Sequence, residues 1–262
     1  MVFRPFFIYN LLMFSTIPPS TLFPSSDRFC AGKAPLLYQS SIIFTLVHKI
    51  AVCCTKLFFI FVLFIAFGCS STRISDLRNG DLLFIVNGNG NNITNVTKGM
   101  DGLGIDHVAI FADGNITEAI PEYGVVESSL DSFMVRLSDW ESVLVGRVEG
   151  LDVDASVANA RKLLGKPYDD IFMPSDSAIY CSELVQKSFV FDGKHQGLED
   201  KDGLRFVFDV IPMSFHDSTG NVTEFWTKFY AARGLAVPEG EPGTNPGQLS
   251  RDPNVKIIGR LQ

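Results

Sequence analysis

The stretch YCSELV, residues 180–185, places a cysteine at the start of a predicted helix. The helix is expected over 177–191, where Cys181, Leu184 and Ser188 recur with helical spacing on one face. Unpaired N–H groups at a helix N-terminus favour the thiolate form of a cysteine. The position therefore indicates a thiol nucleophile, and the alternative is a small core residue on the apolar face of the helix.

A histidine lies in a predicted strand 74 positions before this cysteine. The segment HVAIF, residues 107–111, is predicted to be this strand, and a hairpin turn centred on Asp113-Gly114 follows it. The returning strand, 116–120, carries Glu118. Adjacent strands bring side chains within reach of one another, so contact between His107 and Glu118 is expected if the register allows it.

These residues suit thiol chemistry. An imidazole can accept the proton of a thiol and later donate it to a leaving group, while a third polar group fixes the orientation of the ring. We therefore predict Cys181 as the nucleophile and His107 as the general base and acid. Glu118 is the first candidate for the orienting residue, and Glu122 is the second.

The elements around this constellation predict one α+β domain with an antiparallel sheet over 79–262. Loops are expected at 87–104 and at the Pro/Gly-rich segment 238–253. Helices are expected from Ser128 or Ser129 to 133, from an N-cap at Asp152 to a stop at Gly165, and over 222–233. Further strands are expected at 82–86, 125–127, 142–148 and 254–258.

The N-terminal part predicts export. The run LFFIFVLFIAF, residues 57–67, has 11 apolar residues. A membrane-spanning helix needs about 20, whereas the apolar region of a secretory signal needs about 7 to 15. With Lys49 and Lys56 in front of this run, residues 47–68 are predicted to be a signal peptide. Residues 1–46 fit no part of a signal and are predicted to be non-native or disordered.

The signal ends in AFGCS, residues 66–70, which resembles a bacterial lipobox. In such a motif the cysteine, here Cys69, is acylated and becomes the new N-terminus. The alternative is an unmodified cysteine after an ordinary signal peptide. The lipobox predicts a lipid anchor on a membrane of the bacterial cell envelope, facing the periplasm or the cell surface, followed by a polar tether over 69–78.

Composition excludes several classes of function. From Cys69 onward the chain holds 17 basic and 28 acidic residues, a formal charge of −11, which argues against binding to nucleic acid. The sequence contains no Gly-rich phosphate loop followed by Lys-Ser/Thr, no Cys-x-x-Cys pair and no His-Glu-x-x-His. No metal and no organic cofactor is expected.

Six short motifs in this order resemble the YiiX-like branch of the circularly permuted, papain-like NlpC superfamily. Together they cover nearly all of residues 78–260, and the histidine strand precedes the cysteine helix, the reverse of ordinary papain-like enzymes. The motifs are GDLLF (80–84), HVAIF (107–111), TEA (117–119), GKPYD (165–169), YCSELV (180–185) and NPGQL (245–249).

The resemblance implies a permuted papain-like fold with Cys181 as nucleophile, His107 as general base and acid and Glu118 as the orienting residue. It also implies that the backbone N–H of Cys181 contributes to an oxyanion hole. Tyr180 is expected to shape the cleft beside the thiol. Tyr168 is assigned to the substrate-binding side and not to catalysis.

The function expected from these features is a cell-envelope cysteine hydrolase that cleaves an amide bond through an acyl-enzyme. Its partners would be a peptide, a peptidoglycan fragment or an acylated small molecule. Two alternatives remain open. A lipid acyl hydrolase or acyltransferase of the same fold predicts an apolar groove beside Cys181, and a non-catalytic binding lipoprotein predicts a thiol far from His107.

Overall fold

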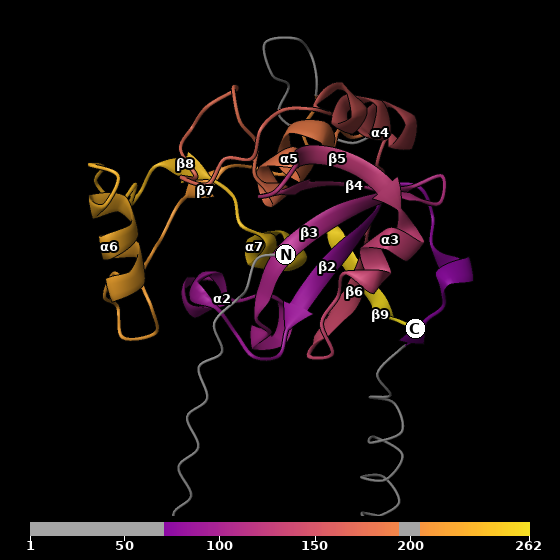
Figure 1. Cartoon of the computed structure of the whole chain (residues 1–262). Coiled ribbons are helices and arrows are strands. Elements are labelled where there is room, and N and C mark those ends of the chain that lie inside the picture. Colours follow the sequence, from indigo (N-terminus) through magenta and orange to yellow (C-terminus); the bar gives the residue numbers. More distant parts are fainter. Residues whose placement is uncertain (1–70, 194–204) are drawn as a thin grey trace, which may run out of the picture. The chain divides into compact units, whose positions relative to one another are not determined.

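A computed structural model describes residues 71–193 and 205–262, which form helices around a seven-stranded sheet (Figure 1). The strands of this sheet are β1 (Ser71–Thr72), β2 (Asp81–Asn87), β3 (Ile105–Ala112), β4 (Asn115–Ile120), β5 (Gly124–Ser129), β6 (Glu141–Val148) and β9 (Val255–Leu261). Their order is β1-β9-β6-β2-β3-β4-β5. Neighbouring strands are antiparallel except β1 and β9, which are parallel. The predicted α+β class with an antiparallel sheet is therefore confirmed.

Helices pack on both faces of the sheet. They are α2 (Asn92–Val96), α3 (Leu130–Val135), α4 (Val153–Lys162), α5 (Cys181–Ser188), α6 (Glu224–Ala231) and α7 (Pro246–Ser250), with single 3-10 turns η1 (Ile74–Asp76) and η2 (Met100–Gly102). Side chains alternate along a strand, so Leu82 and Leu83 of β2 point to opposite faces. Leu82 belongs to the hydrophobic cluster that contains Leu184 of α5, and Leu83 belongs to the cluster that contains Phe133 of α3.

The predicted hairpin between the strands of His107 and Glu118 is present. Asp113 and Gly114 both have positive φ, 53° and 77°, as a two-residue turn of type I′ requires. This turn joins β3 directly to β4 and places the two strands side by side.

A third cluster, which we call the aromatic cluster, consists of Met213, Phe215, Trp226 and Tyr230, with Phe172 packed against it. It joins α6 to the segment around the small two-stranded sheet of β7 (Ile211–Pro212) and β8 (Pro242–Gly243). Trp226 meets Phe172 and Phe215 edge to face, with ring centroids 5.8 and 5.3 Å apart. Aromatic pairs favour such geometry, so this cluster forms a firm wall beside the main core.

The helix predicted over 177–191 is shorter than expected. It spans 181–188, because the residues before it are extended and Ile179 pairs with Tyr168 in a parallel β-bridge. At its end Val190 forms an antiparallel bridge, which again requires extended backbone. The helix therefore begins at Cys181 itself.

Both predicted loops contain regular structure. The segment 87–104 includes α2, where the Asn91 side chain accepts from the N–H groups of two residues of the first turn. The segment 238–253 includes α7, which has Asn245 as its N-cap and Pro246 in its first turn. These expectations are wrong because such one-turn helices depend on caps and tertiary contacts, and not on apolar periodicity.

The segment 69–78 was predicted to be a polar tether, but its described residues, 71–78, begin with a strand of the sheet. Ser71 and Thr72 pair with β9 as the edge strand β1, and Thr72 is buried, because β9 offers an open edge to that segment. The segments 1–46 and 47–68 and the predicted lipidation site Cys69 lie outside the described residues. Among the described residues, no helix is long and apolar enough to cross a membrane.

Candidate active site

Cys181 is the first residue of α5, and Tyr180 is the extended N-cap residue before it. The helix is held in place by Leu184 and Val185, which are fully buried against the sheet. Cys181 is only 4% exposed and is the free cysteine of the described residues. The N–H groups of a first helical turn have no acceptor within the helix, so a group bound beside this sulfur meets hydrogen-bond donors.

His107 lies at an irregularity in β3. In the neighbouring strand β2, Ile85 pairs with His107 and Val86 pairs with Ile105. Asp106 is therefore the extra residue of a β-bulge. Bulges redirect side chains and are frequent next to active sites. The bulge allows Ile105 to be buried in the core while His107 turns towards β4.

The structure brings His107 and Glu118 together: His107 Nε2 lies 2.9 Å from Glu118 Oε2. The described pairing of β3 with β4 covers three positions and ends at Ile110 and Thr117. Beyond that point β4 continues its pairing with β5, and the His107 and Glu118 side chains meet past the end of the ladder. Glu122, the other candidate, lies on the exposed turn between β4 and β5.

Arg136 completes this arrangement, and the sequence analysis missed it. It is the C-cap residue of α3, and its Nη2 donates to Oε1 of Glu118, the oxygen that His107 does not use. Glu118 is 1% exposed, so its carboxylate depends on these two partners for hydrogen bonds. No local signal pairs Arg136 with Glu118, because the contact joins a helix end to a strand 18 residues earlier.

Opposing effects set the pKa of His107. Burial of the ring lowers it, because an imidazolium ion is costly away from water. The hydrogen bond and charge of Cys181, together with those of Glu118, raise it by more and bring the pKa of His107 to about 10. Since Glu118 engages Nε2, the ring nitrogen left for the sulfur is Nδ1. The arrangement therefore favours a protonated imidazole between a sulfur and a carboxylate.

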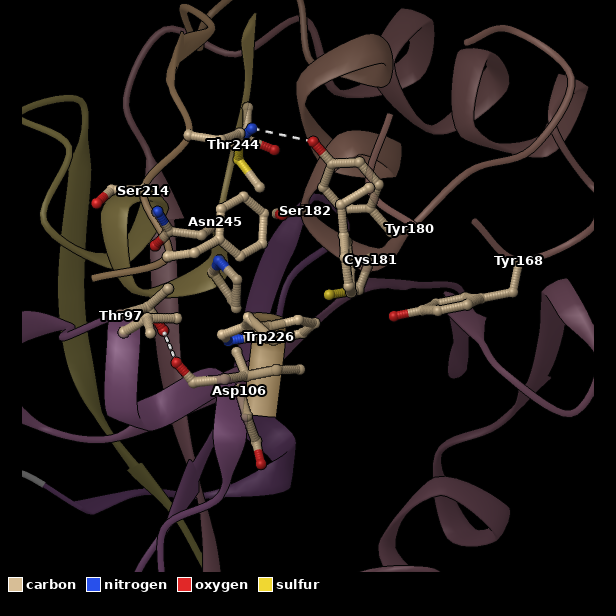
Figure 2. Close-up of a pocket in the computed structure, with 16 residues that line it drawn as sticks. Thr97, Asp106, Tyr168, Tyr180, Cys181, Ser182, Ser214, Trp226, Thr244 and Asn245 are labelled. Atoms are coloured by element: carbon tan, nitrogen blue, oxygen red, sulfur yellow. Dashed lines mark hydrogen bonds between the residues drawn. The ribbon is translucent and has the colours of Figure 1, made fainter. Parts of the chain in front are cut away.

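Cys181 opens into a pocket with a cavity volume of about 40 Å³ (Figure 2). Its aromatic and apolar lining comes from Met213, Phe215 and Trp226 of the aromatic cluster and from Phe172, Tyr168 and Tyr180. In Figure 2 the hydroxyl of Tyr168 points towards Cys181. Burial raises the pKa of Tyr168 well above its usual range, and the charge of Cys181 adds to this effect, so the hydroxyl keeps its proton.

Tyr180 lines the same pocket and anchors a distant segment. Its hydroxyl accepts the backbone N–H of Thr244 at 3.0 Å, which fixes the residues after β8 beside the start of α5. Burial raises the pKa of Tyr180 to about 12. Both tyrosines named from the sequence therefore flank Cys181, while Trp226 and Thr244, which also line the pocket, were not foreseen.

Other polar clusters of the described residues are weaker candidates for a catalytic or metal site. His216 and Glu239 form a second histidine–carboxylate pair, with Nδ1 and Oε1 3.1 Å apart, but this pair is partly exposed and has no thiol beside it. Across 71–193 and 205–262, no three His, Cys, Asp or Glu side chains gather in an arrangement that could hold a metal ion.

Comparisons with known proteins agree with this architecture. Residues 76–259 match a family model described as permuted papain-like amidase enzymes of the YaeF/YiiX, C92 family. The crystal structure of the metalloprotein YiiX from Escherichia coli O157:H7 has a similar fold, with a TM-score of 0.54 and 22% sequence identity. That similarity covers 70% of this chain and 97% of the other protein. A search of curated proteins finds no match.

Proposed function

Because the chain belongs to the family of permuted papain-like amidases, the YaeF/YiiX or C92 family, we propose that Cys181, His107 and Glu118 together hydrolyse an amide bond. The family makes the chain a cysteine amidase or peptidase. The observation that carries the proposal is the placement of one imidazole between two partners. His107 Nε2 lies 2.9 Å from Glu118 Oε2, and Cys181 at the start of α5 raises the pKa of the same ring.

The first half of the reaction forms an acyl-enzyme. Cys181 Sγ attacks the carbonyl carbon of the substrate as its proton passes to Nδ1 of His107. Negative charge develops on the carbonyl oxygen, where the backbone N–H of Cys181 donates to it. His107 then gives its proton to the leaving nitrogen, the C–N bond breaks, and an amine departs. The acyl group remains on Cys181 as a thioester.

Water completes the cycle. His107, now neutral, accepts a proton from a water molecule as the water oxygen attacks the thioester carbonyl. The C–S bond breaks, the proton returns to the sulfur, and a carboxylic acid leaves. Glu118 holds the ring in one orientation and stabilises its charged form through both half-reactions, and Arg136 holds Glu118.

A second candidate function is supported by the lining of the pocket. Phe172, Met213, Phe215 and Trp226 give the space beside Cys181 an apolar and aromatic wall. Such a wall suits an acyl chain, as expected for a lipid acyl hydrolase or an acyltransferase. In a transferase the same thioester would react with an alcohol or amine in place of water. The effect of Cys181 on the His107 ring, whose pKa it raises, argues against the third hypothesis, a binding protein without turnover.

Mass spectrometry of the acyl-enzyme tests the proposal and separates the two candidates. We expect that the full chain, incubated with bacterial envelope extract and quenched in acid, carries a thioester adduct on the peptide containing Cys181. An adduct mass of an amino acid or peptide supports the amidase, and a fatty acyl mass supports the second candidate. An adduct that persists in Cys181→Ala, or lies on other residues, would exclude Cys181 as the nucleophile.

We further propose that the protein is a lipid-anchored protein of the bacterial cell envelope, with the anchor on Cys69. The support is the lipobox-like AFGCS after an 11-residue apolar run. Labelled palmitate, fed to bacteria that express the full chain, should appear in the wild type and vanish in Cys69→Ala. Cys181→Ala is the matched control and should keep the label. Equal labelling of wild type and Cys69→Ala would rule out this anchor.

A further inference from the structure

We propose that the hydroxyl groups of Ser182 and Thr244 bind a neutral amide group of the substrate, close to the carbonyl that Cys181 attacks. The apolar part of the same acyl group would then lie against Phe172 and Trp226. The proposal rests on the proposed function and narrows its substrate class. The favoured substrates are N-acylated amino acids or peptides, in preference to plain fatty acyl groups.

The first argument is that two hydroxyl groups are buried without a well-aligned partner. Ser182 is 0% exposed and Thr244 is 2% exposed; Oγ of Ser182 has no hydrogen-bond partner, and Oγ1 of Thr244 has no well-aligned one, although the Thr244 side chain acts on the Tyr180 hydroxyl and lowers its pKa. Buried polar groups are nearly always hydrogen-bonded, because an unmade bond leaves the cost of desolvation without compensation. Two such groups in one pocket indicate partners that arrive with a ligand.

The second argument is their position. Of the buried side-chain oxygens without a well-aligned partner in the described parts of the chain, only those of Ser182 and Thr244 belong to residues that line the Cys181 pocket. Ser182 directly follows Cys181 in α5. Thr244 is held beside it, because its backbone N–H donates to the Tyr180 hydroxyl at 3.0 Å (Figure 2). Both hydroxyls are thus fixed relative to the sulfur.

The charge of the pocket selects the kind of ligand. Its lining contains one carboxylate, Asp106, and no lysine or arginine. Asp106 accepts hydrogen bonds from the side chains of Asn87 and Asn91, and burial raises its pKa. An anionic group would find no cationic partner in this lining. A hydroxyl both donates and accepts, so a neutral amide, with one N–H and one C=O, matches the pair.

Two esters of equal length test this selection. The acyl chains of p-nitrophenyl N-butanoylglycinate and p-nitrophenyl heptanoate have the same number of backbone atoms, and only the first contains an amide. We expect the wild-type full chain to have a kcat/KM about tenfold or more higher for the amide-containing ester. Ser182→Ala and Thr244→Val should each lower this ratio about fivefold to tenfold, the usual effect of one neutral hydrogen bond.

Matched variants separate binding from structure. Thr72→Val removes another buried hydroxyl without a partner, but one on β1 outside the pocket, and should leave the ratio unchanged. Thr244→Ser keeps the hydroxyl and should keep most of the selectivity. The melting temperatures of Ser182→Ala and Thr244→Val should not fall, because each loses a buried hydroxyl without a well-aligned partner.

Several results would overturn the inference. These are a wild type that prefers the heptanoate, variants with an unchanged ratio, or a lowered melting temperature with equal losses on both esters. Failure of the proposed function itself looks different, because Cys181→Ala would then hydrolyse both esters as fast as the wild type.

Discussion

Replacing Cys181 by alanine lowers the kcat/KM for an amide probe, N-butanoylglycine p-nitroanilide, by about 10⁴-fold or more, in the range seen when a catalytic nucleophile is removed. The reason is that the reaction loses its covalent step, and the remaining donors at the start of α5 can only polarise the carbonyl. We expect His107→Ala to cause a loss of similar order, because a p-nitroaniline nitrogen must receive a proton before it leaves.

The double variant provides the sharper measurement. Residues that act as one unit have effects that do not add, so Cys181→Ala combined with His107→Ala should be no slower than the slower single variant. Release of p-nitroaniline measures the rate, and circular dichroism with thermal unfolding checks that each variant is folded. Losses that multiply, or a folded Cys181→Ala enzyme with more than a few per cent of wild-type activity, would contradict the assignment.

Replacing Glu118 by glutamine lowers kcat/KM by about 10² to 10⁴-fold and moves the alkaline limit of activity to lower pH. Burial lowers the pKa of His107, and Cys181 and Glu118 raise it to about 10. The protonated ring is the acid that serves the leaving group, so activity persists below that value and falls as the pH rises through it. Without the Glu118 charge the pKa of His107 drops, and the fall begins earlier.

Two variants of the same hairpin region serve as comparisons for pH–rate profiles. Glu122→Gln changes an exposed turn residue and should leave both the rate and the profile as in the wild type. Arg136→Ala should reduce the rate less than Glu118→Gln does, because Glu118 keeps its bond to His107, but it should also lower the melting temperature, because the buried Glu118 carboxylate loses one of its two partners. A profile that shifts in Glu122→Gln and stays fixed in Glu118→Gln would reverse the assignment of the orienting residue.

Part of the site could be predicted because it depends on local signals. The turn at Asp113-Gly114 makes β3 and β4 neighbours, and this alone places His107 near Glu118. The register could not be predicted, because the bulge at Asp106 and the early end of the ladder result from tertiary packing.

The walls of the pocket were beyond prediction for a different reason. Trp226 and Thr244 follow Cys181 by dozens of residues, and they reach it only through the aromatic cluster and the Tyr180 hydroxyl. The helix α7 lies in a Pro/Gly-rich segment and was also missed. Its N-cap residue Asn245 indicates the start of a helix, whereas its hydrophobic pattern does not. Long-range contacts of single side chains leave no periodic trace in a sequence.

The pairing of β1 with β9 also governs how the enzyme would meet a bilayer. If Cys69 carries acyl chains, only Ser70 separates it from Ser71, where the sheet begins. Two residues extend over no more than about 7 Å, which is about the thickness of one lipid headgroup layer. The catalytic domain would then lie directly on the lipid surface, with the β1 edge of the sheet facing the membrane and no flexible linker between the two. Its reach would be limited to molecules in, or very near, that surface.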